Sequence, residues 1–291
     1  EKIPQLPGEL IQQFPKMSYP QIAYEAVKPY LGEMVADSAL RSMLDDAYNY
    51  DVPVQKVYDG KYVMRLDRGP TCSFKDFAAR LMGRLIQYFL KQEERSILIL
   101  TATSGDTGSA VAHAFHGLDS VKVVVLFPER EVTDRQRRQM TTLGRNVFPL
   151  AVHGKFDDCQ ALVKQAFVDP ELSALNLSSA NSINIGRLLP QAVYYFYAQS
   201  RAAPAGGEVV FSIPSGNFGD LMGGLLALRM GLPAKKFVAA TNENDEFPRF
   251  MKTGTYEPIS PSKNCISNAM NVGHPSNLAR IFSLYGGQMD E

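Results

Sequence analysis

Lys75 is the residue of this chain best placed for covalent chemistry. It lies in the segment GPTCSFKDF (69–77), directly before a run of residues with helical patterning. The apolar residues of that run recur on one face of a 3.6-residue repeat, which predicts a helix packed on a core over 76–91. Ser73 or Thr71 is expected to cap its start. A cation is disfavoured at this end of a helix, so the position favours an amine that acts as a nucleophile.

A glycine-rich loop much later in the chain could bind a phosphate group. The segment EVVFSI (208–213) reads as a buried strand and 220–230 as a helix, with PSGNFG (214–219) between them. Glycines let such a turn aim several backbone N–H groups at one anion, and the helix N-terminus adds partial positive charge. The loop has neither the Walker pattern nor G-x-G-x-x-G, which disfavours a nucleotide. A lysine and a phosphate cradle together favour a Schiff base with a phosphorylated aldehyde, most obviously pyridoxal phosphate.

Two further segments could bind anions. Hydroxyls and backbone N–H groups cluster in ATSGDTGS (102–109), between a predicted strand at 96–101 and a helix of small residues. Farther on, Ser182, Asn184 and Arg187 could converge from a loop and the first turn of a helix, where arginine offers a two-pronged donor for phosphate. Such a site would imply a phosphorylated substrate. The alternative for this segment alone is a capped helix with a surface arginine.

Strands and helices alternate along most of the chain. After the strand at 96–101, a strand at 121–127 and a helix around 157–167 follow, as in a doubly wound α/β sheet. The N-terminal region differs in character, because 1–20 is rich in proline and 22–48 reads as two helices. The sequence therefore predicts an α/β protein with an added N-terminal helical region.

Composition excludes several classes of function. The 30 basic and 30 acidic residues among 291 cancel, so no global field favours nucleic acid or an anionic membrane. Three widely spaced cysteines indicate reduced thiols in a cytosol rather than a disulfide framework. His113 and His116 have no acidic or thiol partner near them in sequence, so no metal site is predicted. The basic cluster Arg135, Arg137 and Arg138 is expected to be a solvated helix face.

Taken together, the motifs resemble those of threonine synthase, a pyridoxal-phosphate enzyme of fold type II, in its longer subgroup with an extra N-terminal region. The resemblance covers nearly the whole chain in the right order, and its most specific part is the combination of the lysine motif, ATSGDTG and SGNFGD. The matching segments are GPTCSFKDFA around Lys75, ATSGDTGSA (102–110), RRQMTTLG (137–144), FDDCQALVK (156–164), SANSINIGRLLPQ (179–191), PSGNFGDLMGG (214–224) and ATNENDEFPRF (240–250).

The resemblance implies a role for each motif. Lys75 would carry the cofactor and move protons at the α and β carbons of the substrate, with Phe74 packed near the cofactor. The residues implied to bind the cofactor phosphate or lie beside it are Gly216, Asn217, Phe218, Gly219 and Asp220. The loop implied to hold the substrate carboxylate and close over the cofactor ring contains Ser104, Gly105, Asp106 and Thr107, of which Asp106 is assigned to the cofactor. The group implied to bind the substrate phosphate is Ser182, Asn184 and Arg187.

The implied reaction converts O-phospho-L-homoserine and water to L-threonine and phosphate. Two alternatives remain open: another fold type II enzyme such as a serine or threonine dehydratase, and a non-catalytic homologue that binds pyridoxal phosphate or a phosphoamino acid. The sequence departs from the family at Arg68, where a histidine is expected before Gly-Pro-Thr. Family chains are also expected to start before Glu1 and to continue beyond Glu291, so the residue that contacts the pyridine nitrogen is expected to be missing from this chain.

The same resemblance predicts the organisation of the chain. The fold would be of the tryptophan synthase β type, with two doubly wound α/β domains after an N-terminal helical region at 1–60. Residues 61–75 and 181–291 would belong to the large cofactor-binding domain, and 76–180 would form a small mobile domain. A cytoplasmic monomer or homodimer that acts on a small molecule, without nucleic acid, membrane or metal, is expected.

Overall fold

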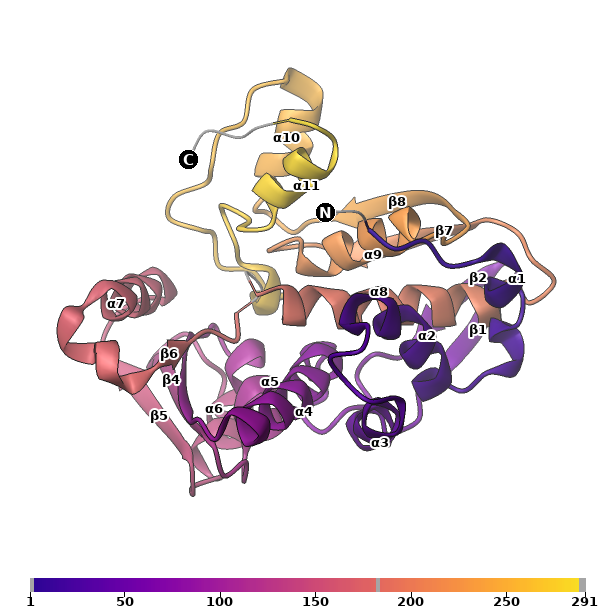
Figure 1. Ribbon diagram of the computed structural model, residues 1–291. Helices are drawn as coiled ribbons and strands as arrows, with labels where there is room; N and C mark the ends of the chain where they lie inside the picture. Colours follow the sequence, from indigo (N-terminus) through magenta and orange to yellow (C-terminus); the bar gives the residue numbers. More distant parts are fainter. Residues whose placement is uncertain (1–2, 182–183, 288–291) are drawn as a thin grey trace. The chain divides into compact units, whose positions relative to one another are not determined.

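The computed structural model describes residues 3–181 and 184–287 (Figure 1). The chain divides into two compact units. The lysine unit comprises residues 36–53 and 64–187, and the loop unit comprises 1–35, 54–63 and 188–291. The predicted domain boundaries at residues 60, 75 and 180 stay a prediction.

A four-stranded parallel sheet lies at the centre of the lysine unit, in the order β5-β4-β3-β6. Its strands are β3 (Ile97–Ala102), β4 (Val121–Pro128), β5 (Val147–Val152) and β6 (Leu177–Ser178). In this register Ile99 pairs with Val123, and Val123 in turn pairs with Val147. Parallel strands need crossover connections, and helices supply them here. The predicted strands at 96–101 and 121–127 and the alternation of β and α elements are confirmed.

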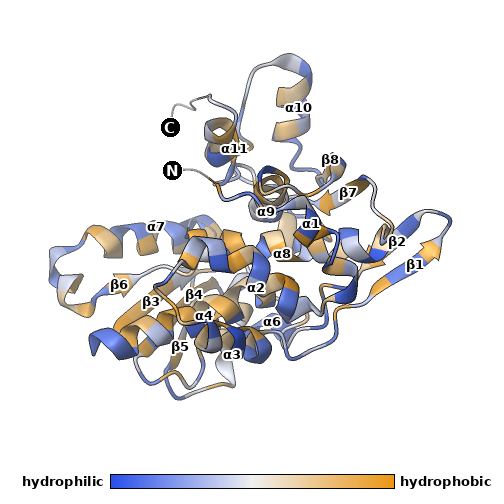
Figure 2. Ribbon diagram, turned by 45° about the vertical axis from the view of Figure 1, so that its right-hand side comes forward, coloured by the Kyte–Doolittle hydropathy of each residue, from blue (hydrophilic) through white to orange (hydrophobic). Residues whose placement is uncertain are grey.

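Alternate side chains of β3 and β4 supply two different cores. Ile99, Val123 and Val125 face a cluster formed with α4, α5 and α6, whereas Leu100 and Leu126 face α7. The helices are α4 (Lys75–Glu93), α5 (Asp106–Phe115), α6 (Asp134–Thr141) and α7 (Phe156–Val168). A sheet covered on both faces explains why both strands are apolar at most positions, with Thr101 and Lys122 as the exceptions (Figure 2).

The helix that begins at Lys75 is fixed on two sides within its unit. On one side α4 crosses α5 so closely that a Cβ on Gly83 would lie 3.0 Å from the carbonyl oxygen of Ala114. On the other side α3 (Asp37–Ala47) packs against it. There the buried Arg80 donates to the carbonyl oxygens of Asp46 and Ala47, both at 2.7 Å. The position of the α4 N-terminus is therefore set by packing along the body of the helix. A short 3-10 turn, η2 (Pro170–Leu175), completes this unit.

The N-terminal part of the loop unit is helical and packs on α8. It contains α1 (Gly8–Ile11), the 3-10 turn η1 (Phe14–Lys16) and α2 (Tyr19–Leu31), and α8 runs from Ile185 to Ala202. Ser18 and Gln21 form a capping box at the start of α2. Phe14 meets Phe196 edge-on at 5.7 Å, and Arg201 donates to the carbonyl oxygens of Phe14 and Pro15. Predicted helices in 22–48 are confirmed, and a hairpin of β1 (Val54–Tyr58) and β2 (Lys61–Met64) follows them.

A two-stranded parallel sheet with a helix between its strands carries the glycine-rich loop. Its elements are β7 (Val209–Pro214), α9 (Gly219–Arg229) and β8 (Ala234–Ala240). Phe211 stacks on Phe237 across the two strands. Two glycines of α9 allow its close packing, because a Cβ on Gly223 would lie 2.7 Å from Gln191 and one on Gly224 2.8 Å from Phe237. The strand-loop-helix prediction for 208–230 is confirmed.

The end of the chain adds α10 (Glu246–Thr253), the 3-10 turn η3 (Asn268–Met270) and α11 (Leu278–Leu284). The sequence patterns did not predict these elements. Within residues 3–181 and 184–287, no helix combines the length and apolarity needed to cross a bilayer.

Candidate active site

Lys75 is the first residue of α4 and lies against a carboxylate. Its Nζ is 3.1 Å from Oδ2 of Asp106, the first residue of α5. The Lys75 side chain is 12% exposed and that of Asp106 is 28% exposed. The ammonium also lies over the ring of Phe74, 4.4 Å from its centroid. The lysine is therefore not an isolated cation at a helix start, because a carboxylate and an aromatic face stabilise its charge.

Asp106 is itself held from a second side. The Nε2 of Gln136 on α6 donates to its Oδ1 at 2.7 Å, so both carboxylate oxygens have partners. Burial by itself raises the pKa of the Asp106 carboxyl, but the Lys75 ammonium and the hydrogen bonds from Gln136 and Lys75 outweigh it and hold the pKa below its ordinary value. An ionised carboxylate thus faces the lysine throughout the neutral range.

The turn before Lys75 is organised by Asp76 rather than by a capping hydroxyl. The backbone N–H and Oγ1 of Thr71 donate to the two oxygens of Asp76, at 2.8 and 2.7 Å. The prediction that Thr71 caps the helix was therefore wrong, because the helical carboxylate binds the threonine. Ser73 fits its prediction better, since its Oγ accepts from the Lys75 N–H at 3.3 Å. A Cβ on Gly69 would lie 2.5 Å from Asp76 Oδ2, so only glycine fits beneath this carboxylate.

The segment around Asp106 is a tight turn built on one threonine. Oγ1 of Thr103 accepts from the N–H groups of Gly105 and Gly108, at 2.9 and 2.8 Å. Gly105 has a φ of 132°, a conformation that side chains disfavour. Ser104 and Thr107 are half-buried beside it. The structure thus brings Ser104, Asp106 and Thr107 to the start of α5, in the same unit as Lys75.

The third predicted group lies at the start of α8. Asn184 accepts from the N–H of Gly186 at 2.9 Å and donates to the carbonyl oxygen of Ser179 at 3.1 Å. Arg187 is only 3% exposed, and its guanidinium donates to the carbonyl oxygen of Ala180 at 2.6 Å. The alternative of a surface arginine is therefore wrong. Ser182 lies outside the described residues.

The glycine-rich loop of the loop unit is backed by a distant segment of the chain. A Cβ on Gly216 would lie 2.9 Å from the Cα of Met270, so the backbones of the loop and of η3 touch there. Phe218 has a φ of 57° and places its ring 4.8 Å from that of Phe247. Ser215 donates its N–H to the carbonyl oxygen of Ala240 at 2.8 Å. These contacts fix the loop immediately before the N-terminus of α9.

The polar side chains of this loop point to other protein groups. Oδ1 of Asn217 accepts from the N–H and Oγ of Ser276, at 2.6 and 2.9 Å, and Asn277 donates to the Asn217 carbonyl oxygen. The carboxylate of Asp220 accepts from the hydroxyls of Tyr194 and Tyr195, at 2.7 and 2.5 Å. Sequence reasoning missed all four of these partners, and only the polar run in GHPSN (273–277) marks any of them.

Comparison with known proteins agrees with this geometry. Residues 55–291 match the family model described as "Pyridoxal-phosphate dependent enzyme", and residues 1–48 match "Threonine synthase N terminus". A threonine synthase of Serratia marcescens is 48% identical over 258 residues, which are 88% of this chain and 59% of that protein. The crystal structure of threonine synthase from Escherichia coli superposes with a TM-score of 0.91 at 41% identity, over 98% of this chain and 67% of that one.

The chain belongs to the threonine synthase family of pyridoxal-phosphate-dependent enzymes. A related structure, described as threonine synthase from Brucella melitensis with bound PLP, has a TM-score of 0.91 at 38% identity and covers 98% of this chain and 63% of that one. Pyridoxal phosphate is the cofactor that membership of this family assigns to the chain. The chain spans 59% to 64% of the length of the first two curated relatives it matches.

Two groups of described residues in this threonine synthase family member fit the cofactor. One could bind its phosphate and the other its aldehyde, and each lies in a different unit. The loop unit supplies a glycine pressed on Met270 and the N-terminus of α9, whose first N–H groups have no acceptor inside the helix. The lysine unit supplies a largely buried amine beside Asp106. Among the described residues, no group of three or more His, Cys, Asp or Glu side chains could hold a metal ion.

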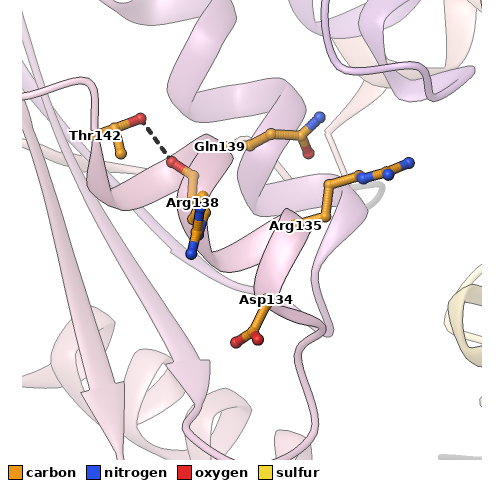
Figure 3. A pocket seen from close by; sticks show the side chains of 5 residues that line it. All are labelled: Asp134, Arg135, Arg138, Gln139 and Thr142. Atoms are coloured by element: carbon orange, nitrogen blue, oxygen red, sulfur yellow. Dashed lines mark hydrogen bonds between the residues drawn. The ribbon is translucent and has the colours of Figure 1, made fainter.

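A hollow of about 480 Å³ on α6 is a weaker candidate site. It is lined by Asp134, Arg135, Arg138, Gln139 and Thr142. Figure 3 shows that Arg138 points away from Arg135 and Gln139, so the two arginines do not converge on one ligand. Gln139 donates instead to the carbonyl oxygen of Thr71 at 3.2 Å. The hollow therefore matches the prediction of a solvated basic helix face.

Proposed function

We propose that the whole protein converts O-phospho-L-homoserine and water to L-threonine and phosphate. The observation that carries the proposal is the largely buried Lys75, paired with Asp106 at 3.1 Å, inside a chain whose relatives at 41% to 48% identity are named threonine synthases. Release of phosphate with cleavage of a carbon–oxygen bond would make the protein a carbon–oxygen lyase. The assignment of this phosphorylated substrate and of the lyase class rests on the names of the relatives and on the buried arginine at the start of α8.

Lys75 would bind the aldehyde carbon of the cofactor through Nζ and later carry protons at the α and β carbons of the substrate. When bound, pyridoxal phosphate withdraws electrons from the attached amino acid, which makes protons at those carbons removable. Asp106 keeps the amine in one place, because its Oδ2 lies 3.1 Å from Nζ. The packing of α4 on α3 and α5 then fixes the direction from which the amine reaches a substrate.

The glycine-rich loop would hold the cofactor phosphate with backbone N–H groups of residues 216–220. Its side chains are turned to Ser276, Tyr194 and Tyr195, which leaves the anion to the backbone and to the positive end of α9. Asp220 would therefore lie beside the phosphate as a support for the loop, with its charge satisfied by two hydroxyls.

The substrate would be bound by the other two groups. Ser104, Gly105 and Thr107 lie at the positive end of α5, a position that suits a carboxylate. Arg187 and Asn184 would bind the phosphate of the substrate, and the hydrogen bond of Arg187 to Ala180 pre-positions its guanidinium. A fixed cation at the departing phosphate stabilises charge where it develops. Together with this assignment we propose residues 76–180 as the small mobile domain and 61–75 with 181–291 as the large one.

The first test is to trap the cofactor. The protein is incubated with pyridoxal phosphate, reduced with borohydride and digested, and the modified peptide is identified by mass spectrometry. The adduct is expected on Lys75, and phosphate release from O-phosphohomoserine is expected in the full-length protein. Lys75→Arg keeps a cation beside Asp106 and should abolish both. Deamination of serine or threonine without activity on the phosphorylated substrate would favour a dehydratase, and an adduct without any product would favour a non-catalytic binder.

A further inference from the structure

Gln136 is the residue that connects α6 to the lysine. It is the third residue of α6 and is half-buried. Its Nε2 donates to Asp106 Oδ1 at 2.7 Å, and Asp106 Oδ2 is the oxygen that faces Lys75 Nζ. A chain of contacts thus runs from the start of α6 through Asp106 to the lysine.

The orientation of the Gln136 amide is determined by its neighbours. Its Oε1 accepts from the backbone N–H and the Oγ1 of Thr133, at 3.0 and 2.9 Å. If the amide were rotated by half a turn, its NH₂ would face the Thr133 N–H and its oxygen would face the Asp106 carboxylate. Both contacts would then be repulsive, so only the donor can be directed at Asp106.

Packing holds the same side chain in place. A Cβ on Gly105 would lie 2.4 Å from Cδ of Gln136, which shows that the amide lies directly on this glycine. The backbone of Gln136 is also contacted by α5, because the Ser109 hydroxyl lies 3.2 Å from the Gln136 carbonyl oxygen and shares its proton with the Gly105 carbonyl oxygen at 3.0 Å. Gln136 therefore serves the capping box of α6 with one atom and Asp106 with another.

We propose that Gln136 is a positioning residue, which holds Asp106 in the orientation that keeps the Lys75 amine at the start of α4. It acts through Asp106 and needs no contact with substrate. The role of Lys75 toward the cofactor belongs to the proposed function, on which the catalytic meaning of this inference rests. The geometry of the three side chains does not depend on it.

The charged groups near Lys75, Asp106 and Gln136 determine how a substitution at position 136 can affect the Lys75 amine. On α4 the Asp76 carboxylate is turned onto Thr71, and on α5 His113 acts on Asp76 electrostatically and lowers the pKa of that carboxyl. On α6, Asp134 pairs with Arg137 at 2.8 Å. In this set only Asp106 is ion-paired with the amine, so changes at position 136 should reach Lys75 through that carboxylate.

Two substitutions at position 136 should shift the pH at which the Lys75 amine loses its proton, in opposite directions. Gln136→Glu keeps the capping box, since Thr-x-x-Glu is the usual form of that motif, but it places a second carboxylate 2.7 Å from Asp106 in place of a donor. Over the alkaline range the additional negative charge should stabilise the Lys75 ammonium. Gln136→Met keeps the volume and removes the donor, so Asp106 can turn toward solvent and the ammonium loses its partner.

The measurement is the rate at which an acylating reagent labels Lys75, followed by peptide mass spectrometry over a series of pH values on the full chain without added cofactor. The half-maximal pH is expected to rise with Gln136→Glu and to fall with Gln136→Met, each by roughly 0.5 to 1 unit, about a three- to tenfold change in rate at fixed pH. Thr133→Val is the matched control. It loses the hydroxyl of the capping box but keeps the N–H that orients Oε1 of Gln136. The half-maximal pH of Lys75 labelling should therefore equal that of the wild type, while the melting temperature falls.

No fall of the half-maximal pH in Gln136→Met would overturn the proposal, because loss of the donor would then leave the pairing of Asp106 with Lys75 unchanged. If Gln136→Met does not fold, Gln136→Ala removes the same donor without adding charge and should lower the half-maximal pH in the same way. Failure of the proposed function is a separate result: it would show as absence of a borohydride adduct on Lys75 in the wild type, whatever the labelling profiles show.

Discussion

The lysine unit and the loop unit hold their candidate functional groups by different means. In the lysine unit the functional group is held by a charged partner, because Lys75 pairs with Asp106. In the loop unit, the loop at 214–219 is held by backbone contact with Met270 and by the neutral side chain of Ser276. The difference suits the two tasks. An amine that must change its charge needs charged neighbours, whereas a phosphate is bound by backbone N–H groups that keep their partial charge at any pH.

The largest effect should come from filling the contact between the loop backbone and η3. In Gly216→Ala the new Cβ meets the Met270 backbone at 2.9 Å, and neither side is a flexible side chain that could give way. We expect a loss of about 1–3 kcal/mol in the free energy of unfolding, as for other overpacked sites, and at least a tenfold loss of affinity for pyridoxal phosphate. Chemical denaturation and a cofactor titration measure the two effects.

Gly8→Ala in α1 is the matched control for this change, because nothing lies within 4 Å of its Cβ position. It should leave both quantities unchanged. Labelling of Lys75 should also be unaffected in Gly216→Ala, since the loop belongs to the other unit. Unchanged cofactor affinity in Gly216→Ala would show that this loop does not bind the phosphate.

The next effect concerns the neutral hydroxyls that support Asp220. Tyr195→Phe removes a donor to the Asp220 carboxylate and to its carbonyl oxygen, at 2.5 and 3.0 Å. Leaving part of a half-buried carboxylate without its donor should cost about 1–2 kcal/mol in the free energy of unfolding. Tyr194→Phe removes one bond to the same Oδ1, and the double variant should lose more than the sum of the two, because in each single variant the other hydroxyl still donates to the shared acceptor.

These losses should be the same from neutral to mildly alkaline pH. Burial and the Asp220 carboxylate raise the pKa of both tyrosines well above the ordinary value, so the hydroxyls remain neutral donors over that range. A loss in Tyr195→Phe that depends strongly on pH would contradict the contrast between the two units.

The sequence predicted the features that depend on neighbouring residues better than the contacts between residues far apart in the chain. The helix at Lys75 and the strand-loop-helix at 208–230 follow from local periodicity and glycines, and both are confirmed. The pairing of Lys75 with Asp106 could not be predicted, because it joins the starts of two helices that only the crossing of α4 and α5 brings together. The binding of Thr71 to Asp76 was not predicted either, since both a threonine before a helix and an aspartate in its first turn are common.

A smaller effect should separate the two aspartates of the lysine unit by the sign of their pH dependence. Burial raises the pKa of the Asp76 carboxyl, and the hydrogen bonds from Thr71 offset that rise in part, whereas the pKa of Asp106 is lowered once Lys75 and Gln136 outweigh its burial. A raised pKa means stability that is lost as pH increases through the folded value. A lowered pKa means stability that is lost as pH falls through the folded value.

The measurement is the unfolding free energy of the wild type, Asp76→Asn and Asp106→Asn across the acid range. Relative to Asp76→Asn, the wild type should become less stable as pH increases from the ordinary aspartate pKa through the raised one. Relative to Asp106→Asn, it should become more stable as pH increases from the lowered pKa through the ordinary one. Parallel difference curves would show that the two carboxylates share one environment and that the distinction drawn here is wrong.

The smallest effect should come from Ser276→Ala, because the change removes only half of the support of Asn217. The Ser276 hydroxyl at 2.9 Å is lost, but the backbone N–H at 2.6 Å still donates to the same Oδ1. We expect a loss of about 0.5–1 kcal/mol in the free energy of unfolding and less than a threefold loss of affinity for pyridoxal phosphate. Asn217→Ala removes the acceptor itself and should cost more on both measures, because the Ser276 N–H then loses its partner. Equal losses in the two variants would mean that the hydroxyl orients Asn217 on its own.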